Sequence, residues 1–287
     1  MQRDALLITT DALEGRLTDS RLRVFDCTVL LEFGPDGVAF ASGRNAWEAG
    51  HIPGAGFLDL IDEFAAPHPT LHFMLPSAER FARAISAHGF AADSHVVLYD
   101  GSSGAWATRM WWMLYTYGFA DAKVLDGGWA KWIAEGRRTS TEVSAHPPAI
   151  FVPRPRPGVF VGRDDVLAAM SDDRARLING LSEPMHRGEN PPIPGRRQGH
   201  IPGSVNVPSD RLLDEQTREF LPDAELRAAL EHAGALGADR VITYCGGGIA
   251  ASHVAFALRL LGHQDVSVYD ASLEEWATDP SLPLEVG

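Results

Sequence analysis

The sequence predicts an α/β protein built from two similar halves, each a doubly wound, mostly parallel sheet flanked by helices. Three observations predict this class. The chain has 287 residues, a length that suits about two domains. A long stretch of the chain repeats once. Strand-like and helix-like segments alternate within each half.

The repeat indicates that both halves share one fold. A Gly-His-Ile-Pro-Gly pentapeptide occurs twice, and a longer segment downstream of it also recurs, with Tyr99 in the first copy matching Tyr244 in the second. The repeated segments are 50–54 with 199–203, and 96–132 with 241–276.

A proline-rich segment separates the two copies. Residues 146–158 contain five prolines, a composition that resists helix formation and favours an extended connector. The sequence therefore predicts a first domain at 1–145, a linker at 146–158 and a second domain at 159–287.

The second half shows the alternation of elements in order. Hydrophobic patterning predicts strands at 176–178, 241–244 and 266–269, and helices at 223–232 and 249–261. Ser272 and Glu275 have the spacing of a capping box for a last short helix. Strands separated by helices form parallel sheets, and in such sheets ligands bind at the carboxyl ends of the strands.

Cys245 lies at such a strand end. It follows the strand 241–244 and precedes three glycines and a helix that begins near Ile249. Glycines let the backbone curl, so that amide N–H groups at the helix start can point at one centre and stabilise an anion. Such a field lowers the pKa of a thiol below about 8.5 and favours the thiolate. A small buried cysteine followed by a flexible turn is the alternative interpretation.

Charge and cysteine content argue against several functions. Lys and Arg number 25 against 38 Asp and Glu, a net charge of −13, so nucleic acid and anionic membranes are not expected as partners. The amino terminus does not resemble a secretory signal, and no apolar run reaches membrane-spanning length. Cys27 and Cys245 make neither a disulfide framework nor a metal site, and we expect a reducing, cytoplasmic setting.

The segment from Tyr244 to Ala251 resembles the active-site loop of the rhodanese family, most closely that of its mercaptopyruvate sulfurtransferases. The repeated pentapeptides and the stretches 74–76, 111–113 and 126–128 also resemble family members, so the likeness spans nearly the whole chain. It implies two rhodanese-like domains, of which only the second is catalytic. The alignment of the halves agrees, because it places Asp100 opposite Cys245 and a carboxylate cannot carry sulfur.

By this resemblance the protein is a sulfurtransferase that works through a persulfide on Cys245. The cysteine takes a sulfane sulfur from a small donor, 3-mercaptopyruvate or thiosulfate, and passes it to a thiol or cyanide, or to a protein acceptor, in two steps. The resemblance implies no metal and no organic cofactor. The cradle for the sulfur comprises Gly246, Gly247, Gly248, Ile249, Ala250 and Ala251.

The chain departs from the family at positions that contact the donor. Gly246 stands where thiosulfate-using members carry a cation, and Gly247 where mercaptopyruvate-using members carry a hydroxyl. The His and Asp of the family's first domain are also replaced, and His72 and Asp62 are displaced candidates for their roles.

The arginines that hold the donor's anionic group in the family are replaced as well. Their positions hold Leu181 and Met185, and the nearby Arg187 and Arg196 are the candidates to bind the donor in their place. The alternative interpretation is that these are solvated loop arginines.

Three other functions compete with this interpretation. A phosphatase of related fold needs an arginine that closes the loop, and this chain has Ala251 there, which argues against it. A sulfur relay between proteins and a non-catalytic binding protein whose donor contacts have diverged both stay open.

Several other residues are predicted to be structural. His51 and His200 occupy the repeated turns and are expected to make the same hydrogen bond in both halves. His253 lies two turns into the helix after Cys245, so contact with the sulfur is not expected. Cys27 is expected to pack within a strand, and Trp111, Trp112, Trp129 and Trp132 to pack in the core and between domains.

Overall fold

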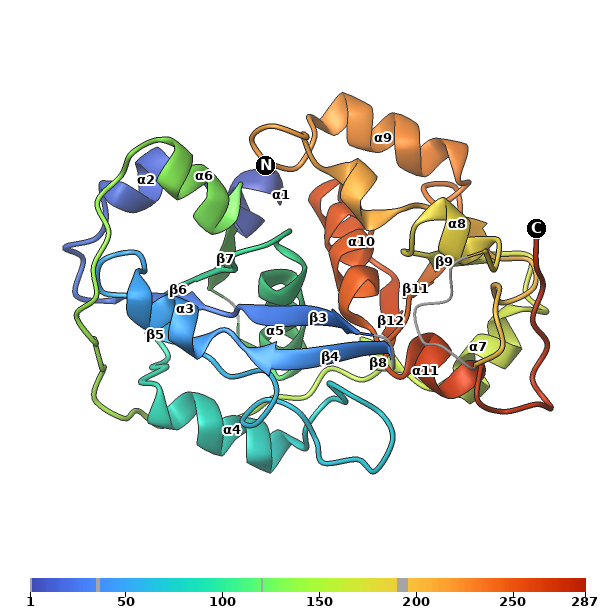
Figure 1. The fold of residues 1–287 in the computed structure, drawn as a ribbon, viewed down its shortest axis with the longest axis horizontal. Coiled ribbons are helices and arrows are strands. Elements are labelled where there is room, and N and C mark those ends of the chain that lie inside the picture. Colours follow the sequence, from blue (N-terminus) through green and yellow to red (C-terminus); the bar gives the residue numbers. More distant parts are fainter. Residues whose placement is uncertain (1, 35–36, 120, 190–195) are drawn as a thin grey trace.

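The computed structural model describes residues 2–34, 37–119, 121–189 and 196–287. Two α/β halves lie side by side, the first running from blue to green and the second from yellow to red in Figure 1. The predicted fold class is confirmed, since each half is built on a five-stranded parallel sheet with helices around it.

The elements of the first half are α1 (Gln2–Leu6), β1 (Leu7–Ile8), α2 (Thr10–Glu14), β2 (Leu22–Asp26), β3 (Val29–Gly34), β4 (Gly37–Ser42), α3 (Arg44–Ala49), β5 (Gly56–Phe57), α4 (Ala78–Ala87), β6 (His95–Tyr99), α5 (Ala105–Thr116), β7 (Ala122–Leu125) and α6 (Gly128–Ala134). Those of the second half are β8 (Phe160–Val161), α7 (Arg163–Ala169), β9 (Ala175–Asn179), α8 (Glu183–His186), β10 (Val205–Asn206), the 3₁₀ helix η1 (Ser209–Leu212), α9 (Asp223–His232), β11 (Arg240–Tyr244), α10 (Ile249–Leu260), β12 (Val266–Tyr269) and α11 (Ser272–Trp276).

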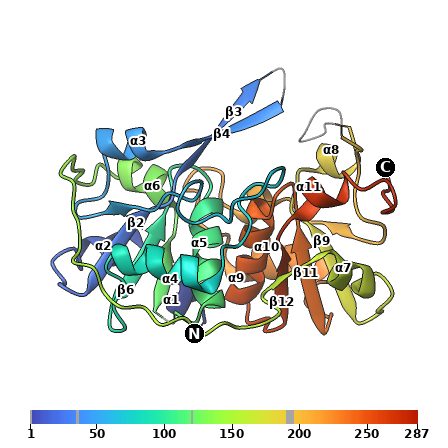
Figure 2. The ribbon, with the colours of Figure 1, turned by 90° about the horizontal axis from the view of Figure 1, so that it is seen from below.

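The two sheets have the same topology. The strand order is β1-β7-β6-β2-β5 in the first half and β8-β12-β11-β9-β10 in the second, so each strand has a counterpart in the other half. Even the register agrees: Asp26 pairs with Tyr99 at the end of β6, and Asn179 pairs with Tyr244 at the end of β11. In addition, β3 and β4 form an antiparallel hairpin that projects from the first half (Figure 2).

The core of the molecule crosses the boundary between the halves. Helices α5 and α10, which follow equivalent strands, pack against each other in the centre (Figure 1). The Trp112 indole donates a hydrogen bond from Nε1 to the Ser252 carbonyl oxygen at 2.9 Å, and the Trp111 ring meets the edge of Phe256 at 5.0 Å between centroids. Burial of aromatic surface on both helices therefore holds the two halves together.

Two local predictions were wrong. Ser272 does not cap α11, because its φ is +52° and its hydroxyl donates instead to the Tyr269 carbonyl oxygen at 2.8 Å. Cys27 does not lie within a strand, since β2 ends at Asp26 and β3 begins at Val29. Cys27 is nevertheless fully buried, as expected of a packing residue.

The prediction for the repeated histidines is confirmed. His51 Nδ1 bonds to the Trp47 carbonyl oxygen at 2.7 Å, and His200 Nδ1 bonds to the His186 carbonyl oxygen at 2.9 Å. Both rings thus tie the repeated turn to the chain before it. Throughout the described ranges, each helix is too short or too polar to cross a membrane.

Candidate functional site

Cys245 lies at the junction of β11 and α10, where the sequence predicts it. The helix begins at Ile249 after Gly248, which has φ 80° and ψ −4°. A Cβ at Gly248 would lie 2.7 Å from the Asp270 carbonyl oxygen, so both the left-handed backbone and the close approach require glycine.

The backbone of Cys245 is fixed by the start of α11. Its amide donates to the Ser272 Oγ at 3.1 Å, and its carbonyl oxygen accepts from the Leu273 amide at 3.0 Å. The Cys245 side chain is 2% exposed, and no described group donates a hydrogen bond to its Sγ. The Cys245 residue is thus buried at the junction of β11 and α10, with its backbone tied to α11.

The equivalent loop of the first half holds an anion. The Asp100 carboxylate accepts hydrogen bonds from four backbone amides and one hydroxyl, at 2.8 to 3.0 Å. The donors are the amides of Ser102, Gly104, Trp106 and Ala107 and the hydroxyl of Ser102. Amides at a helix start favour negative charge, and here they enclose it on both oxygens.

The second-half loop has the same backbone conformation at the residue before its helix. Gly104, which precedes α5, has φ 78° and ψ −3°, within a few degrees of Gly248. The counterparts of the Gly104, Trp106 and Ala107 amides are therefore those of Gly248, Ala250 and Ala251. The first-half loop has one residue more between strand and helix, which is where Ser102 supplies its two donors.

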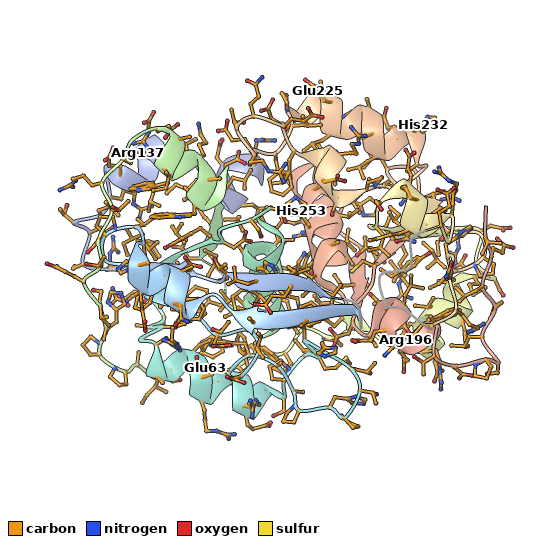
Figure 3. The ribbon with its side chains drawn as sticks, viewed as in Figure 1. Glu63, Arg137, Arg196, Glu225, His232 and His253 are labelled. Carbon is orange, nitrogen blue, oxygen red and sulfur yellow. The ribbon has the colours of Figure 1, made fainter. Side chains whose placement is uncertain are left out.

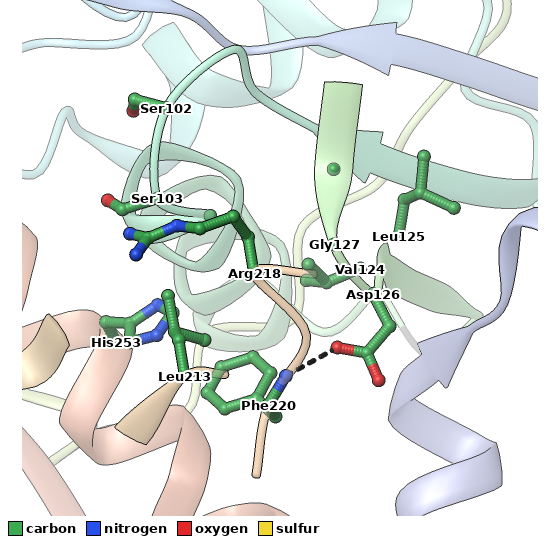
Figure 4. Close-up of a pocket in the computed structure, with 12 residues that line it drawn as sticks. Ser102, Ser103, Val124, Leu125, Asp126, Gly127, Leu213, Arg218, Phe220 and His253 are labelled. Atoms are coloured by element: carbon green, nitrogen blue, oxygen red, sulfur yellow. Dashed lines mark hydrogen bonds between the residues drawn. The ribbon is translucent and has the colours of Figure 1, made fainter. Parts of the chain in front are cut away.

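The first-half loop is closed off from ligands. Figure 4 shows the cavity next to it, which measures about 10 Å³, room for about one water molecule. The His253 ring from α10 fills the space, stacked on Phe220 with centroids 4.5 Å apart, and burial lowers the pKa of His253 to about 4. The Phe220 amide donates to Asp126 Oδ1 at 2.8 Å, and burial raises the pKa of this carboxyl to about 6.

An ion pair occupies the corresponding place in the second half. Arg109 is five residues after Gly104, just as His253 is five residues after Gly248. Its guanidinium donates to Asp270 Oδ1 at 2.6 Å and to the Phe73 carbonyl oxygen. Asp270 also accepts from the Leu75 amide at 2.8 Å, so the first-half segment 71–75 is attached to the second half beside the cysteine loop.

Glu274 makes the second attachment. Its carboxylate is 5% exposed and accepts from the His72 amide at 2.8 Å and from His72 Nδ1 at 2.5 Å. A Cβ on Gly247 would lie 3.6 Å from Glu274 Oε2, which places this carboxylate against the cysteine loop. Sequence reasoning missed Glu274, Asp270 and Arg109, because their contacts join residues 161 to 202 positions apart.

The two candidates from the first half, His72 and Asp62, differ in whether they reach the cysteine loop. His72 does lie at the site, but its partner is Glu274. The Asp62 side chain is exposed, and its backbone carbonyl oxygen accepts from Arg80 at 2.7 Å. The structure therefore brings His72 to the loop without the predicted aspartate.

The candidate arginines also differ from each other. Arg196 donates from Nη1 to the Glu274 carbonyl oxygen, which puts it beside α11, as Figure 3 shows. Arg187 lies at the end of α8 and pairs with Glu189 at 2.8 Å and with Glu183 at 3.7 Å. Arg196 therefore lies near the loop, and the charge of Arg187 is shared between two carboxylates.

Comparisons with known proteins agree with this architecture. The model of the rhodanese-like domain matches residues 9–135 and 166–279. A probable 3-mercaptopyruvate sulfurtransferase of Pseudomonas aeruginosa is 34% identical over 295 residues, 99% of each chain. The 3-mercaptopyruvate sulfurtransferase of Rattus norvegicus is 34% identical over 270 residues, 93% of this chain and 88% of that protein. The thiosulfate sulfurtransferase of Cricetulus griseus is 34% identical over 237 residues, 81% of this chain and 79% of that protein.

Solved structures show the same fold. The wild-type structure of EanB matches with a TM-score of 0.84 over 100% of this chain and 70% of that chain, at 22% identity. The anaerobic ergothioneine biosynthesis enzyme from Chlorobium limicola matches with a TM-score of 0.85, over 99% of this chain and 71% of that chain, at the same identity. Given the duplicated sheet, the family model that matches both halves and the sulfurtransferases that are similar along most of the chain, this protein belongs to the rhodanese family and is a sulfurtransferase with two rhodanese-like domains.

Proposed function

We propose that Cys245 carries sulfane sulfur as a persulfide from a small donor, 3-mercaptopyruvate or thiosulfate, to a thiol or cyanide. In the first step the Cys245 thiolate attacks the transferable sulfur of the donor, which is the thiol sulfur of 3-mercaptopyruvate or the sulfane sulfur of thiosulfate. The bond between that sulfur and the rest of the donor breaks, and its electron pair leaves with the remainder of the donor. From 3-mercaptopyruvate this remainder is pyruvate, which takes up the proton of the donor thiol. From thiosulfate it is sulfite. In the second step the acceptor attacks the terminal sulfur, and the S–S bond returns its electrons to Cys245.

The observation that carries this proposal is the cradle around Asp100. A carboxylate oxygen lies two bonds beyond Cβ, and so does the terminal sulfur of a cysteine persulfide. The Asp100 oxygens thus serve as a stand-in for that sulfur, and they collect four amide hydrogen bonds. The amides of Gly248, Ala250 and Ala251 would stabilise a persulfide anion on Cys245 in the same way.

The remaining predicted residues have roles within this proposal. Gly246, Gly247 and Ile249 complete the turn around the terminal sulfur. Arg196 is beside the loop and suits the donor's anionic group, whereas Arg187 would reach it only by leaving Glu183 and Glu189. The first half, with Asp100 in its cradle, contributes no nucleophile and acts as a wall of the site. We also propose that the first domain ends at residue 145, that the second begins at residue 159, and that the protein is cytoplasmic.

Intact mass spectrometry tests the proposal. The protein is incubated separately with 3-mercaptopyruvate and with thiosulfate, and we expect the mass of one added sulfur atom, mapped to Cys245. Cys245→Ser should lose the addition and at least about a thousandfold of transfer activity. The matched control is Cys27→Ala, which should retain both. Sulfur found on Cys27, or full activity in Cys245→Ser, would contradict the carrier role. Addition with neither donor would favour a protein-to-protein relay or a binding role.

A further inference from the structure

We infer that Glu274 is a specificity-determining residue that selects against donors whose negative charge lies next to the transferred sulfur. This inference rests on the proposed persulfide chemistry and narrows the donor class. It makes thiosulfate the poor donor and an organic thiol such as 3-mercaptopyruvate, with its carboxylate remote from the sulfur, the preferred one.

The first step of the inference is the position of the charge. The Glu274 amide donates to the Gly246 carbonyl oxygen at 2.8 Å, so the residue is anchored to the cysteine loop by its own backbone. Its carboxylate then returns over the loop, 3.6 Å from where a Gly247 Cβ would be. A carboxylate that is 5% exposed acts on its neighbours through less solvent than a surface charge does.

The second step is the balance of charges around the loop. The other acid here, Asp270, is compensated by the buried guanidinium of Arg109 at 2.6 Å. Glu274 has no arginine or lysine partner for its carboxylate among the described residues, only the amide and ring of His72. Arg196 binds its backbone oxygen, which leaves the guanidinium available for a group at the edge of the site.

The third step compares the two donors. In thiosulfate the sulfonate group is bonded directly to the transferred sulfur, so its charge must approach Glu274 as the sulfur approaches Cys245. In 3-mercaptopyruvate the carboxylate is three bonds from the sulfur and can point away, toward Arg196. The second donor therefore avoids the repulsion that the first must overcome.

Shape supports the same choice. A surface pocket of about 410 Å³ opens on the other side of His72, between the β3–β4 hairpin and the segment 61–73. It is lined mainly by apolar side chains, with Phe40 against Phe73 at 4.8 Å between ring centroids. Such a surface is suited to the carbon skeleton of an organic substrate and has no cation to offer a dianion.

The experiment measures kcat/KM for each donor with cyanide as the common acceptor, because this ratio reports only the donor half of a two-step transfer. In Glu274→Gln we expect kcat/KM for thiosulfate to rise about tenfold, since one repulsive charge is lost, and that for 3-mercaptopyruvate to change less than about threefold. Added salt screens the repulsion, so kcat/KM for thiosulfate should rise with salt concentration. It should rise less in Glu274→Gln than in the unaltered protein.

Glu275→Gln is the matched control. It removes one charge from the next position of α11, where the carboxylate accepts from the Tyr269 hydroxyl at 2.5 Å, and should shift neither donor more than about twofold. Glu274→Ala is a second variant with the same expected shift in the donor ratio, should the glutamine fold poorly. An unchanged ratio of the two donors in a folded variant that still forms the persulfide would overturn this inference alone. Absence of persulfide in the unaltered protein would overturn the proposed function instead.

Discussion

Asp100 and Cys245 occupy equivalent strand ends, so one half has a carboxylate where the other has a thiol. The two loops end in glycines of nearly identical φ and ψ, so the helix starts offer the same amides. Asp100 fills its cradle with its own carboxylate, whereas the shorter Cys245 side chain ends one bond beyond Cβ. The sequence predicted the equivalence of the two positions correctly, because strand, glycines and helix are adjacent in the chain.

Replacement of Asp100 tests how strongly the first cradle binds an anion. Asp100→Asn keeps the shape but turns an NH₂ group toward amide donors, and should lower the free energy of unfolding by roughly 2–3 kcal/mol. Urea denaturation measures this loss. Asp93→Asn, an exposed control, should stay within about 0.5 kcal/mol of the unaltered protein. Equal stability of the two variants would mean that the amides do not bind the Asp100 charge.

Cys27 illustrates why a second cysteine is not a second nucleophile. It is fully buried, and desolvation, followed by the nearby Asp26 and Asp100 carboxylates, raises the pKa of its thiol well above the ordinary value. Asp26 is itself an acid whose pKa burial raises to about 6. The thiol therefore stays protonated near neutral pH.

At the scale of elements, the loop between β11 and α10 depends on one glycine more than on the others. Gly248 has a left-handed backbone and is in contact with the Asp270 carbonyl oxygen, whereas a Cβ on Gly246 would meet nothing within 4 Å. Three glycines in a row thus look alike in sequence, and only the tertiary environment distinguishes them.

The stability of two variants should reveal this distinction. Gly248→Ala is expected to lower the free energy of unfolding by about 1–3 kcal/mol, from backbone strain and the clash with Asp270. Gly246→Ala should change it by less than about 0.5 kcal/mol. Thermal and urea denaturation of both proteins give the comparison. A Gly248→Ala protein as stable as Gly246→Ala would show that the left-handed turn can relax.

Ser272 shows where element-scale reasoning fails. Its spacing to Glu275 suggests a capping box, yet its hydroxyl holds the Cys245 amide and Glu275 binds Tyr269. Cys245 follows β11 and Tyr269 ends β12, and the spacing of Ser272 and Glu275 carries no information on these partners. The helix at 223–232 and the strand at 266–269, in contrast, have the predicted bounds, because hydrophobic periodicity alone determines which face is buried.

At the scale of the whole molecule, the two halves are related by contacts as well as by topology. Asp126 accepts the Phe220 amide from the second half, and Asp270 accepts the Leu75 amide from the first. The repeat in the sequence predicted two like domains but neither contact. Leu75 and Phe220 lie in similar segments of the two halves, 74–79 and 220–225, but the sequence pattern does not say which carboxylate each loop meets. Each contact joins a loop of one half to an acid that follows a strand of the other.

His253 gives the interface between the halves a pH dependence. Burial lowers its pKa from 6.5 to about 4, so the folded protein favours the neutral ring. This stabilisation is complete above about pH 6.5 and is lost as the pH falls toward 4. The raised pKa values of Asp26 and Asp126 act in the opposite direction, adding stability as the pH falls through about 6.

A variant isolates the histidine from these acids. Between pH 7 and about pH 4.5, the unaltered protein should lose roughly 2–3 kcal/mol more of its free energy of unfolding than His253→Leu does. His232→Leu, at an exposed position on α9 that Figure 3 shows on the outside of the molecule, is the control and should follow the unaltered protein. Parallel pH curves for all three proteins would remove His253 as the source of acid sensitivity.

The attachment of segment 71–75 restricts how a substrate can enter. Moving the halves apart as on a hinge would break the bonds of His72 to Glu274, of Leu75 to Asp270 and of Arg109 to Asp270 together. All three bonds involve a buried carboxylate, so these charges would have to be rehydrated at the same moment. Turnover by such a clamshell motion would therefore be slow, and sulfur is expected to pass in and out along the rim beside His72, with the two domains remaining docked throughout the cycle.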